Sequence, residues 1–349
     1  MTKIFLIRHA EAEGNLYRIA HGHENGLITD YRGPRQIQAL ARRFRDVPID
    51  AVYSSDLLRT QTTAQAIYIP KHLPLQLDPS FREVGMGVWE GLPWQQVQQQ
   101  WPEQQLNFNR YLDKWQVPGC ETAQQVLDRF LPGLRRIAHS HPGQTVAVFS
   151  HGAAMRIVLG TLQGLSLAEV GRERHCDNTA VSLLEAEGDD IRVVYRDDNS
   201  HLTSCGLSTF ERQTWWKDKK MLETSQLYRP AEAPLVHQLD LPAEHPATAV
   251  WYGDQCPIGA YQLQPEGDAL RIVSYALLPD WRGRRQGIPP LGQIIQRGRR
   301  EGYARLRLTC ADQALRSFWQ RLGFCGDGPE LEKDLALQIP DLRSWVTEP

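Results

Sequence analysis

Short apolar segments alternate with amphipathic segments along the first two hundred residues of the chain. Residues 3–7, 50–53 and 145–149 are apolar runs of strand length, which is typical of strands buried in a parallel sheet. Between these runs, apolar side chains recur at helical spacing. The predicted helices are residues 34–45, capped by Thr29 or Asp30, a helix ending at Ile67 and capped by residues 54–56, and residues 122–138 and 152–162. Later strands are expected over residues 181–184 and 191–195, so the pattern predicts an α/β layer with a mostly parallel sheet.

The pattern loosens near residue 205, and a second α/β pattern follows it. We predict a first domain over residues 1–204, a linker over 205–230 and a second domain over 231–349. Two tryptophans in the linker, Trp215 and Trp216, are expected to pack on a domain face rather than to stand in water. In the second domain, the expected strands are 248–252, 259–264, 270–277 and 305–310, and the expected helices are 291–301 and 313–322.

Composition and charge exclude several classes of function. The 349 residues carry 39 Lys and Arg against 41 Asp and Glu, so nothing indicates a nucleic acid or membrane surface as a partner. No apolar run is long enough to span a bilayer, and the apolar start of the chain is too short for a signal peptide. The six cysteines form no C-x-x-C pair, which predicts a reducing, cytoplasmic environment and no zinc ribbon. The oligomeric state is left open.

Three predicted strands end in groups that suit a phosphate. The first strand delivers Arg8 and His9, the second is followed by Arg59, and the third delivers His151 at the start of a helix. Ligands of open α/β sheets lie beyond the carboxyl ends of the strands, and free amides at a helix start favour an anion. Arginine can bind phosphate oxygens in pairs, and an imidazole kept neutral by nearby cations can attack phosphorus.

Taken together and in this order, the motifs of residues 1–200 resemble the histidine phosphatase (phosphoglycerate mutase-like) superfamily. The segments that carry the resemblance are 6–11 (LIRHAE) with Asn15, 53–60 (YSSDLLRT), 81–91 (FREVGMGVWEG), 149–152 (FSHG) and 178–181 (NTAV). The resemblance implies a three-layer α/β/α fold and phosphomonoester hydrolysis through a phosphohistidine, without a metal cofactor.

The resemblance also assigns a role to each site residue. It implies that His9 is the nucleophile, and that Arg8, Arg59 and His151 bind the phosphate oxygens. It implies that Glu83 protonates the leaving oxygen and later deprotonates water, and that Asn15 adds a phosphate contact. The substrate would be a small phosphorylated metabolite.

Parts of the first half depart from the family pattern. Ala10 replaces the usual glycine after the catalytic histidine, and the loop 21–26 differs from the usual Gln-Gly-Arg-type sequence. His21 and His23 in this loop can be read as a metal pair or as part of the pocket mouth. Residues 89–117 would form a short cap that admits water, which favours a hydrolase over a phosphoglycerate mutase, the alternative. The cap tryptophans form either an apolar wall for the leaving group or simply the core of the cap: Trp89, Trp94, Trp101 and Trp115.

Residues from about 231 to 349 resemble the GNAT acetyltransferase superfamily. The evidence is residues 278–288 (LPDWRGRRQGI), 317–324 (SFWQRLGF) and 331–335 (LEKDL). The resemblance implies a mixed α+β fold and acetyl-CoA as the cofactor, with its pyrophosphate on a turn at a helix start. The residues of that turn are Arg282, Gly283, Arg284, Arg285 and Gly287.

The second half departs more from its family than the first half does. Arg285 stands where the first glycine of the turn motif is usual, and Pro289 and Pro290 remove N–H donors from the helix start. Trp319 replaces the usual tyrosine, and an indole N–H is no useful acid. Three hypotheses therefore stand: a phosphatase fused to a GNAT-like domain whose activity is left open, a bifunctional phosphatase and N-acetyltransferase, and a phosphatase with a non-catalytic binding or assembly module.

Overall fold

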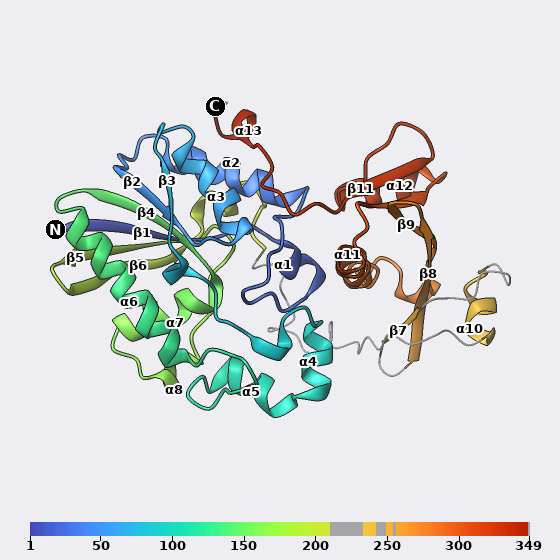
Figure 1. Ribbon diagram of the computed structural model, residues 1–349, viewed down its shortest axis with the longest axis horizontal. Helices are drawn as coiled ribbons and strands as arrows, with labels where there is room; N and C mark the ends of the chain where they lie inside the picture. Colours follow the sequence, from blue (N-terminus) through green and yellow to red (C-terminus); the bar gives the residue numbers. More distant parts are fainter. Residues whose placement is uncertain (210–232, 242–248, 254–255, 348–349) are drawn as a thin grey trace.

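The computed structural model describes residues 1–209, 233–241, 249–253 and 256–347, which form two α/β units (Figure 1). The predicted fold class, a mostly parallel α/β/α sheet followed by a mixed α+β unit, is confirmed. Trp215 and Trp216 of the predicted linker lie outside the described residues. Residues 208 and 209 are described, and both side chains donate hydrogen bonds to Asp177 of the first unit.

Within the described residues, six strands form the first sheet in the order β3-β2-β4-β1-β5-β6. The central strands β2, β4 and β1 pair in parallel, as does β3 with β2, whereas β5 and β6 join as antiparallel strands. The strands are β1 (Thr2–Arg8), β2 (Ala51–Ser54), β3 (Leu75–Leu77), β4 (Thr145–Ser150), β5 (Val181–Glu187) and β6 (Asp190–Asp198).

Helices cover both faces of this sheet because alternate strand residues point to opposite sides. In β1, Ile4 and Leu6 pack with α6 and α7, whereas Ile7 packs with α2 and α3 on the other face. The main helices are α2 (Arg32–Phe44), α3 (Leu58–Tyr68), α6 (Ala123–Ser140) and α7 (Gly152–Leu162). Shorter elements connect them: α1 (Glu13–Tyr17), α4 (Trp94–Gln100), α5 (Pro102–Arg110), α8 (Leu167–Val170), α9 (Ser200–Thr203), and 3₁₀ turns at Pro79–Phe81 and Gly87–Trp89.

Two of the predicted helix caps are wrong. Tyr31 is the N-cap of α2, although the Thr29 hydroxyl still accepts a hydrogen bond from the N–H of Gly33 in the first turn. Leu57 is the N-cap of α3, because the Asp56 side chain turns away and forms an ion pair with Arg82. For α3, a tertiary ion pair thus competes with the local cap.

Five strands form the second sheet in the order β11-β10-β9-β8-β7, and only β9 and β10 pair in parallel among these described strands. They are β7 (Ala249–Gly253), β8 (Cys256–Glu266), β9 (Ala269–Leu277), β10 (Arg305–Thr309) and β11 (Glu330–Asp334). The helices are α10 (Ala233–Gln238), α11 (Pro289–Arg300), α12 (Gln313–Arg321) and α13 (Arg343–Thr347), with a 3₁₀ turn at Pro279–Trp281.

The chain crosses back to the first unit at its C-terminal end (Figure 1). Leu342 and Val346 are buried in the core beneath α2 and α3, and the Gln65 side chain bonds to the backbone of Pro340 and Leu342. Residues 340–346, which the sequence analysis assigns to the second domain, therefore pack on the first.

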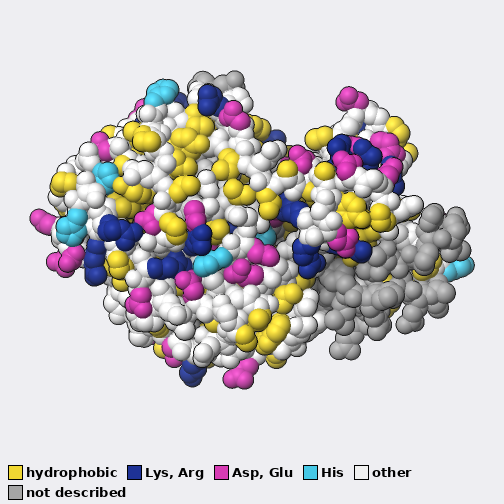
Figure 2. Space-filling model, viewed as in Figure 1, with side chains coloured by type: hydrophobic (Ala, Val, Ile, Leu, Met, Phe, Trp, Pro, Cys, Tyr) yellow, Lys and Arg dark blue, Asp and Glu magenta, His cyan; other side chains and the backbone are white. Residues whose placement is uncertain are grey.

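Acidic and basic side chains are interspersed on the face shown in Figure 2, as the small net charge of −2 leads one to expect. Among the described residues, no helix combines the length and apolar character that crossing a bilayer would require.

Candidate active site

The register of the first sheet brings two histidines together. Arg8 at the end of β1 is paired with Ser150 at the end of β4, so the next residue of each strand, His9 and His151, leaves the sheet at the same edge. The His9 N–H donates to the Ser150 carbonyl at 3.0 Å, and the two imidazole centroids lie 5.3 Å apart. The parallel pairing of residues more than 140 positions apart thus creates the site.

The His9 imidazole is held in the form of a nucleophile. Its Nδ1 lies 2.7 Å from the carbonyl oxygen of Ala10, which can only accept a hydrogen bond, so Nδ1 carries the proton and Nε2 the lone pair. Burial lowers the pKa of His9 well below its ordinary value, and the charges of Arg59 and Arg8 lower it further. The neutral imidazole predicted from the sequence is therefore what this environment favours.

Arg59 lies in the first turn of α3 and is almost fully buried. Its Nε donates to Nδ1 of His151 at 3.2 Å, and its two terminal nitrogens donate to the carbonyls of Glu24 (2.9 Å) and Gly22 (2.8 Å). His151 in turn donates from Nε2 to the Ser55 hydroxyl at 2.9 Å. Burial, with the charge of Arg59 next, lowers the pKa of His151 well below its ordinary value. The cation and the second imidazole are thus fixed as one unit.

Arg8 supplies a second buried guanidinium beside His9. One terminal nitrogen donates to the Cys176 carbonyl, and its Nε is buried without a hydrogen-bond partner among the described residues. The α7 backbone passes so close that a Cβ added at Gly152 would lie 3.0 Å from this Nε. A buried N–H donor without a partner is costly, so this atom marks a position suited to an anion.

Glu83 and Asn15 reach the same edge of the sheet. The Glu83 carboxylate accepts hydrogen bonds from the backbone N–H groups of Ala153 (3.2 Å) and Ala154 (2.8 Å), in the first turn of α7. The Asn15 side-chain oxygen accepts from Asn178 at 3.2 Å, and the same Asn178 amide donates to the His9 carbonyl at 3.0 Å. The structure therefore brings all six residues predicted for this site to one place.

The loop 21–26 forms one wall of the site, and its two histidines play different parts. His21 is packed between Gly14 and Gly26, and burial lowers its pKa to about 3. His23 instead lies 2.8 Å, at Nε2, from the Glu83 carbonyl. Among the described residues, no group of three or more His, Cys, Asp or Glu is placed to hold a metal ion.

Two residues that the sequence analysis did not select hold the Glu83 loop. Arg129 donates to the carbonyls of residues 80, 82 and 83 and forms an ion pair with Glu121, whose other contacts are the N–H of Gly85 and His23. The hydrogen bonds with His23 and Arg129 lower the pKa of Glu121 far below its ordinary range, although burial opposes this. No local signal marks the pair, because its function depends on carbonyls that face it only in the folded chain.

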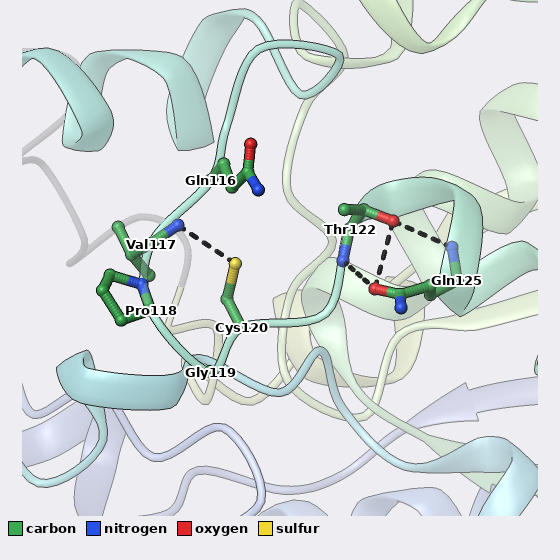
Figure 3. Close-up of a pocket in the computed structure, with 7 residues that line it drawn as sticks. All are labelled: Gln116, Val117, Pro118, Gly119, Cys120, Thr122 and Gln125. Carbon is green, nitrogen blue, oxygen red and sulfur yellow. Dashed lines mark hydrogen bonds between the residues drawn. The ribbon is translucent and has the colours of Figure 1, made fainter.

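A pocket of about 500 Å³ lies along residues 116–125, where the chain enters α6 (Figure 3). Its lining residues are Gln116, Val117, Pro118, Gly119, Cys120, Thr122 and Gln125. Figure 3 shows the Thr122–Gln125 capping interaction at the start of α6 and the contact between the Val117 N–H and the Cys120 sulfur. None of the residues predicted for catalysis lines this pocket, so the chemistry is placed by the strand ends and not by the pocket.

The cap tryptophans pack against one another. Trp89 and Trp115 are fully buried and contact Phe108 edge to face, and Trp94 stacks on Phe108. Trp101 packs on the edge of the same core. For Trp89 and Trp115, the interpretation as cap core is therefore the correct one.

In the second unit, the predicted acetyl-CoA turn combines left-handed backbone conformations with exposed arginine side chains. Arg285 has a φ of +62° and Gly283 a φ of +75°, so the arginine adopts a left-handed conformation that glycine adopts more easily. The side chains of Arg282, Arg284 and Arg285 are exposed. Pro289 and Pro290 open the first turn of α11, as the sequence predicts.

Aromatic side chains fill the space beneath this turn. The pairing of β9 with β10 stops at Ile272 and Leu308, one residue before β10 itself ends, whereas β9 continues to Leu277. Tyr275 donates a hydrogen bond to the Gly287 carbonyl at 2.6 Å, and Trp319 packs edge to face against Tyr275. Trp319 is buried, so its indole is part of the core of the unit.

Two family models match the chain. Residues 4–199 match the model of the histidine phosphatase superfamily (branch 1), and residues 212–324 match that of the acetyltransferase (GNAT) family. Both resemblances predicted from the sequence are confirmed.

Two curated relatives each match a little more than half of the chain. Phosphoserine phosphatase 1 of Hydrogenobacter thermophilus is 32% identical over 54% of this chain and 88% of its own length. A protein named probable phosphoglycerate mutase GpmB, of Yersinia pestis, is 31% identical over 53% of this chain and 85% of its own length.

Solved structures share the fold of the first half. Bacillus stearothermophilus YhfR superimposes with a TM-score of 0.56, at 25% identity, over 58% of this chain and 100% of its own. A mycobacterial glucosyl-3-phosphoglycerate phosphatase has the same fold with a TM-score of 0.52, at 21% identity, over 56% of this chain and 99% of its own.

Proposed function

Because the chain belongs to the histidine phosphatase superfamily through residues 4–199, we propose that it hydrolyses phosphomonoesters through a phosphohistidine on Nε2 of His9. One observation carries the proposal: the neutral His9 imidazole, with its Nδ1 proton held by the Ala10 carbonyl, lies beside two buried guanidinium groups. This arrangement presents a lone pair to a phosphate whose charge is balanced by fixed cations.

In the first step, the lone pair of His9 Nε2 forms a bond to phosphorus while the ester P–O bond breaks. Protonated Glu83 gives its proton to the leaving oxygen, which departs as an alcohol. We assign the phosphate oxygens to Arg8 Nε and to the two further N–H groups on the terminal nitrogens of Arg59, with His151 and Asn15 completing the site. The increase of charge in the transition state is met by donors that the fold has already oriented.

In the second step, the Glu83 carboxylate accepts a proton from a water molecule as the water oxygen bonds to phosphorus. The P–N bond breaks, inorganic phosphate leaves, and His9 recovers its lone pair. The cations of Arg8 and Arg59 supply the electrostatic stabilisation, and no step is assigned to a metal ion.

Hydrolysis is favoured over mutase chemistry by the short cap. The segment from Trp89 to Val117 is a compact aromatic cluster, and a short cap admits the water that the second step consumes. The relatives bear both kinds of name, a phosphatase and a probable mutase, so the choice of acceptor is part of the proposal. The substrate class is a small phosphorylated metabolite, and the cytoplasm is the proposed location.

For the second unit, we propose an acetyltransferase-like domain with weak affinity for acetyl-CoA and little transfer activity. The left-handed conformations of Gly283 and Arg285 in the turn after β9 fit a bound cofactor at that edge, where Arg282, Gly283, Arg284, Arg285 and Gly287 would contact it. The prolines at the start of α11 and the buried Trp319 argue against tight binding and against proton transfer to a thiolate. The bifunctional alternative requires both of these obstacles to be bypassed.

The phosphohistidine is tested by rapid quenching with a phosphate-labelled monoester. Wild-type enzyme should retain protein-bound label after an alkaline quench and lose it after an acid quench, because phosphoramidates are labile in acid. His9→Ala should show neither label nor turnover, whereas His72→Ala, at a histidine of the α3–β3 turn, should keep both. Substantial turnover by His9→Ala would refute the proposal.

A further inference from the structure

The last turn of α11 reaches across to the first unit and pairs with α1. The two terminal nitrogens of Arg299 donate to the two carboxylate oxygens of Glu13 at 2.8 and 2.9 Å. Side-chain exposure is 16% for Arg299 and 9% for Glu13, so the pair is largely shielded from water. The Arg299 Nε donates to the Leu335 carbonyl at 2.9 Å, which fixes the guanidinium from its own unit. A bidentate pair of an arginine and a carboxylate fixes the orientation of both groups and also attracts them to each other.

Packing around the pair joins the two units at the same place. Tyr17 and Ile19, which end α1 and follow it, are buried in the core of the second unit. A Cβ added at Gly292 of α11 would lie 2.3 Å from the Tyr17 Cβ, so only glycine permits this approach. Farther along, Lys333 of β11 donates to Asp30 at 2.8 Å. The second unit therefore holds both ends of residues 13–30.

The inner side of the same segment builds the phosphate site. Two hydrogen bonds join Glu13 to Leu27. The Glu13 N–H donates to the Leu27 carbonyl at 2.9 Å, and the Leu27 N–H donates to the Glu13 carboxylate at 3.1 Å. Between these two residues lie Gly22 and Glu24, whose carbonyls accept the hydrogen bonds of Arg59. Glu13 is thus hydrogen-bonded to Arg299 and also to Leu27, the residue that follows the loop whose carbonyls orient the Arg59 guanidinium.

The helix of this segment is too short to hold Glu13 in place by itself. The α1 helix has five residues, and it ends at Arg18 in a left-handed conformation with a φ of +58°. A helix this short is not stable by itself in water. Removing Arg299 would also leave the Glu13 carboxylate shielded and without its cation, which favours rearrangement of the segment.

We propose that Arg299 is a positioning residue for the phosphatase reaction, so that the second unit completes the phosphate site by fixing Glu13 and the 21–26 loop. The proposal rests on the proposed function, and it gives the acetyltransferase-like unit a part in phosphate binding that requires no acetyl transfer.

The test compares Arg299→Gln, Arg299→Lys and Glu13→Gln in the full chain, with Arg297→Gln as the matched control. Arg297 lies on the same helix but pairs with Glu301 at the surface. Arg299→Gln should weaken binding of inorganic phosphate and lower kcat/KM for p-nitrophenyl phosphate by about tenfold, a typical effect of a group that orients a directly bonded one. Arg299→Lys should recover part of the loss, because lysine keeps the positive charge opposite Glu13 but cannot form the two parallel hydrogen bonds of arginine. The double variant Glu13→Gln/Arg299→Gln should lose no more than Arg299→Gln alone.

Phosphate affinity measured by calorimetry separates positioning from simple stabilisation. A purely structural role would lower Tm and the active fraction while leaving the phosphate Kd and KM of the folded enzyme unchanged, and that result would overturn the proposal. Additive losses in the double variant would overturn it as well. If Arg299→Gln does not fold, Glu13→Gln and Arg299→Lys carry the same comparison. Wild-type enzyme that binds phosphate but neither labels His9 nor turns over would instead refute the proposed function and leave this test standing.

Discussion

The two units use the same local arrangement, basic residues near a helix start at a strand end, with different degrees of preorganisation. In the first unit, Arg8 and Arg59 are 8% and 2% exposed, and carbonyls and an imidazole hold them in place. In the second, the arginines of residues 282–285 stand in solvent above a helix that opens with two prolines. Cations held in a dry site need no reorganisation when charge develops, whereas solvated cations do. The comparison indicates that burial and hydrogen bonding, not the motif alone, distinguish a site equipped for catalysis.

The largest effect that would sharpen this contrast concerns the acid–base group of the first unit. Glu83→Gln should slow hydrolysis of an alkyl phosphate by about 10²–10⁴-fold, because an amide cannot protonate the leaving alkoxide. Hydrolysis of p-nitrophenyl phosphate should fall much less, since its phenolate leaves without a proton. Steady-state rates on both substrates decide the matter, with the exposed Glu103→Gln as control. Equal losses on the two substrates would assign Glu83 a structural role.

A pair of identical substitutions compares the two sets of cations directly. Arg59→Lys should lower kcat/KM by about 10²–10³-fold, because lysine cannot donate to His151, Gly22 and Glu24 while also binding phosphate. Arg284→Lys in the exposed turn should leave phosphatase activity unchanged. Full activity of Arg59→Lys would break the comparison.

Acetyl-CoA binding tests the other half of the contrast. Titration of the full chain by calorimetry should show a Kd no tighter than about 1 mM, corresponding to roughly −4 kcal/mol. The full chain is required because Tyr17 and Ile19 of the first unit complete the core of the second. A micromolar Kd that is lost in Gly287→Glu would show that the prolines and Trp319 do not prevent binding.

The smallest expected effect is the pH dependence of the stability that His23, in the loop 21–26, contributes. The hydrogen bond with Glu121 raises the pKa of His23, with smaller contributions from the Glu83 carbonyl and Glu90. A raised folded-state pKa means that the stabilisation is complete below the unfolded pKa of about 6.5 and is lost as the pH rises through the folded value. The Tm advantage of wild type over His23→Gln should therefore shrink as the pH rises above about 6.5. A difference that grows with pH would contradict the assignment.

The sequence by itself determined the two fold classes and the six residues of the first site. The signals of Arg8, His9, Arg59 and His151 are local, because these residues lie near strand ends or helix starts that the apolar pattern marks, and parallel strands bring such ends to one edge. Glu83 and Asn15 were identified only through the resemblance of their segments to the family. The prolines of α11 and the departure at Arg285 are local features in the same sense, so the amino-acid sequence is enough to identify them.

Only the tertiary structure decided which residues hold those candidates in place. Arg299 and Glu13 are 286 positions apart in the chain, and Asp56 pairs with Arg82 instead of capping α3. Arg129 donates hydrogen bonds to carbonyls of the distant Glu83 loop. Such partners are chosen by the packing of elements far apart in the chain, where a shielded charge or carbonyl must find whichever complementary group the fold brings within reach. No periodicity or motif in one segment contains that information, because the partner lies in another segment.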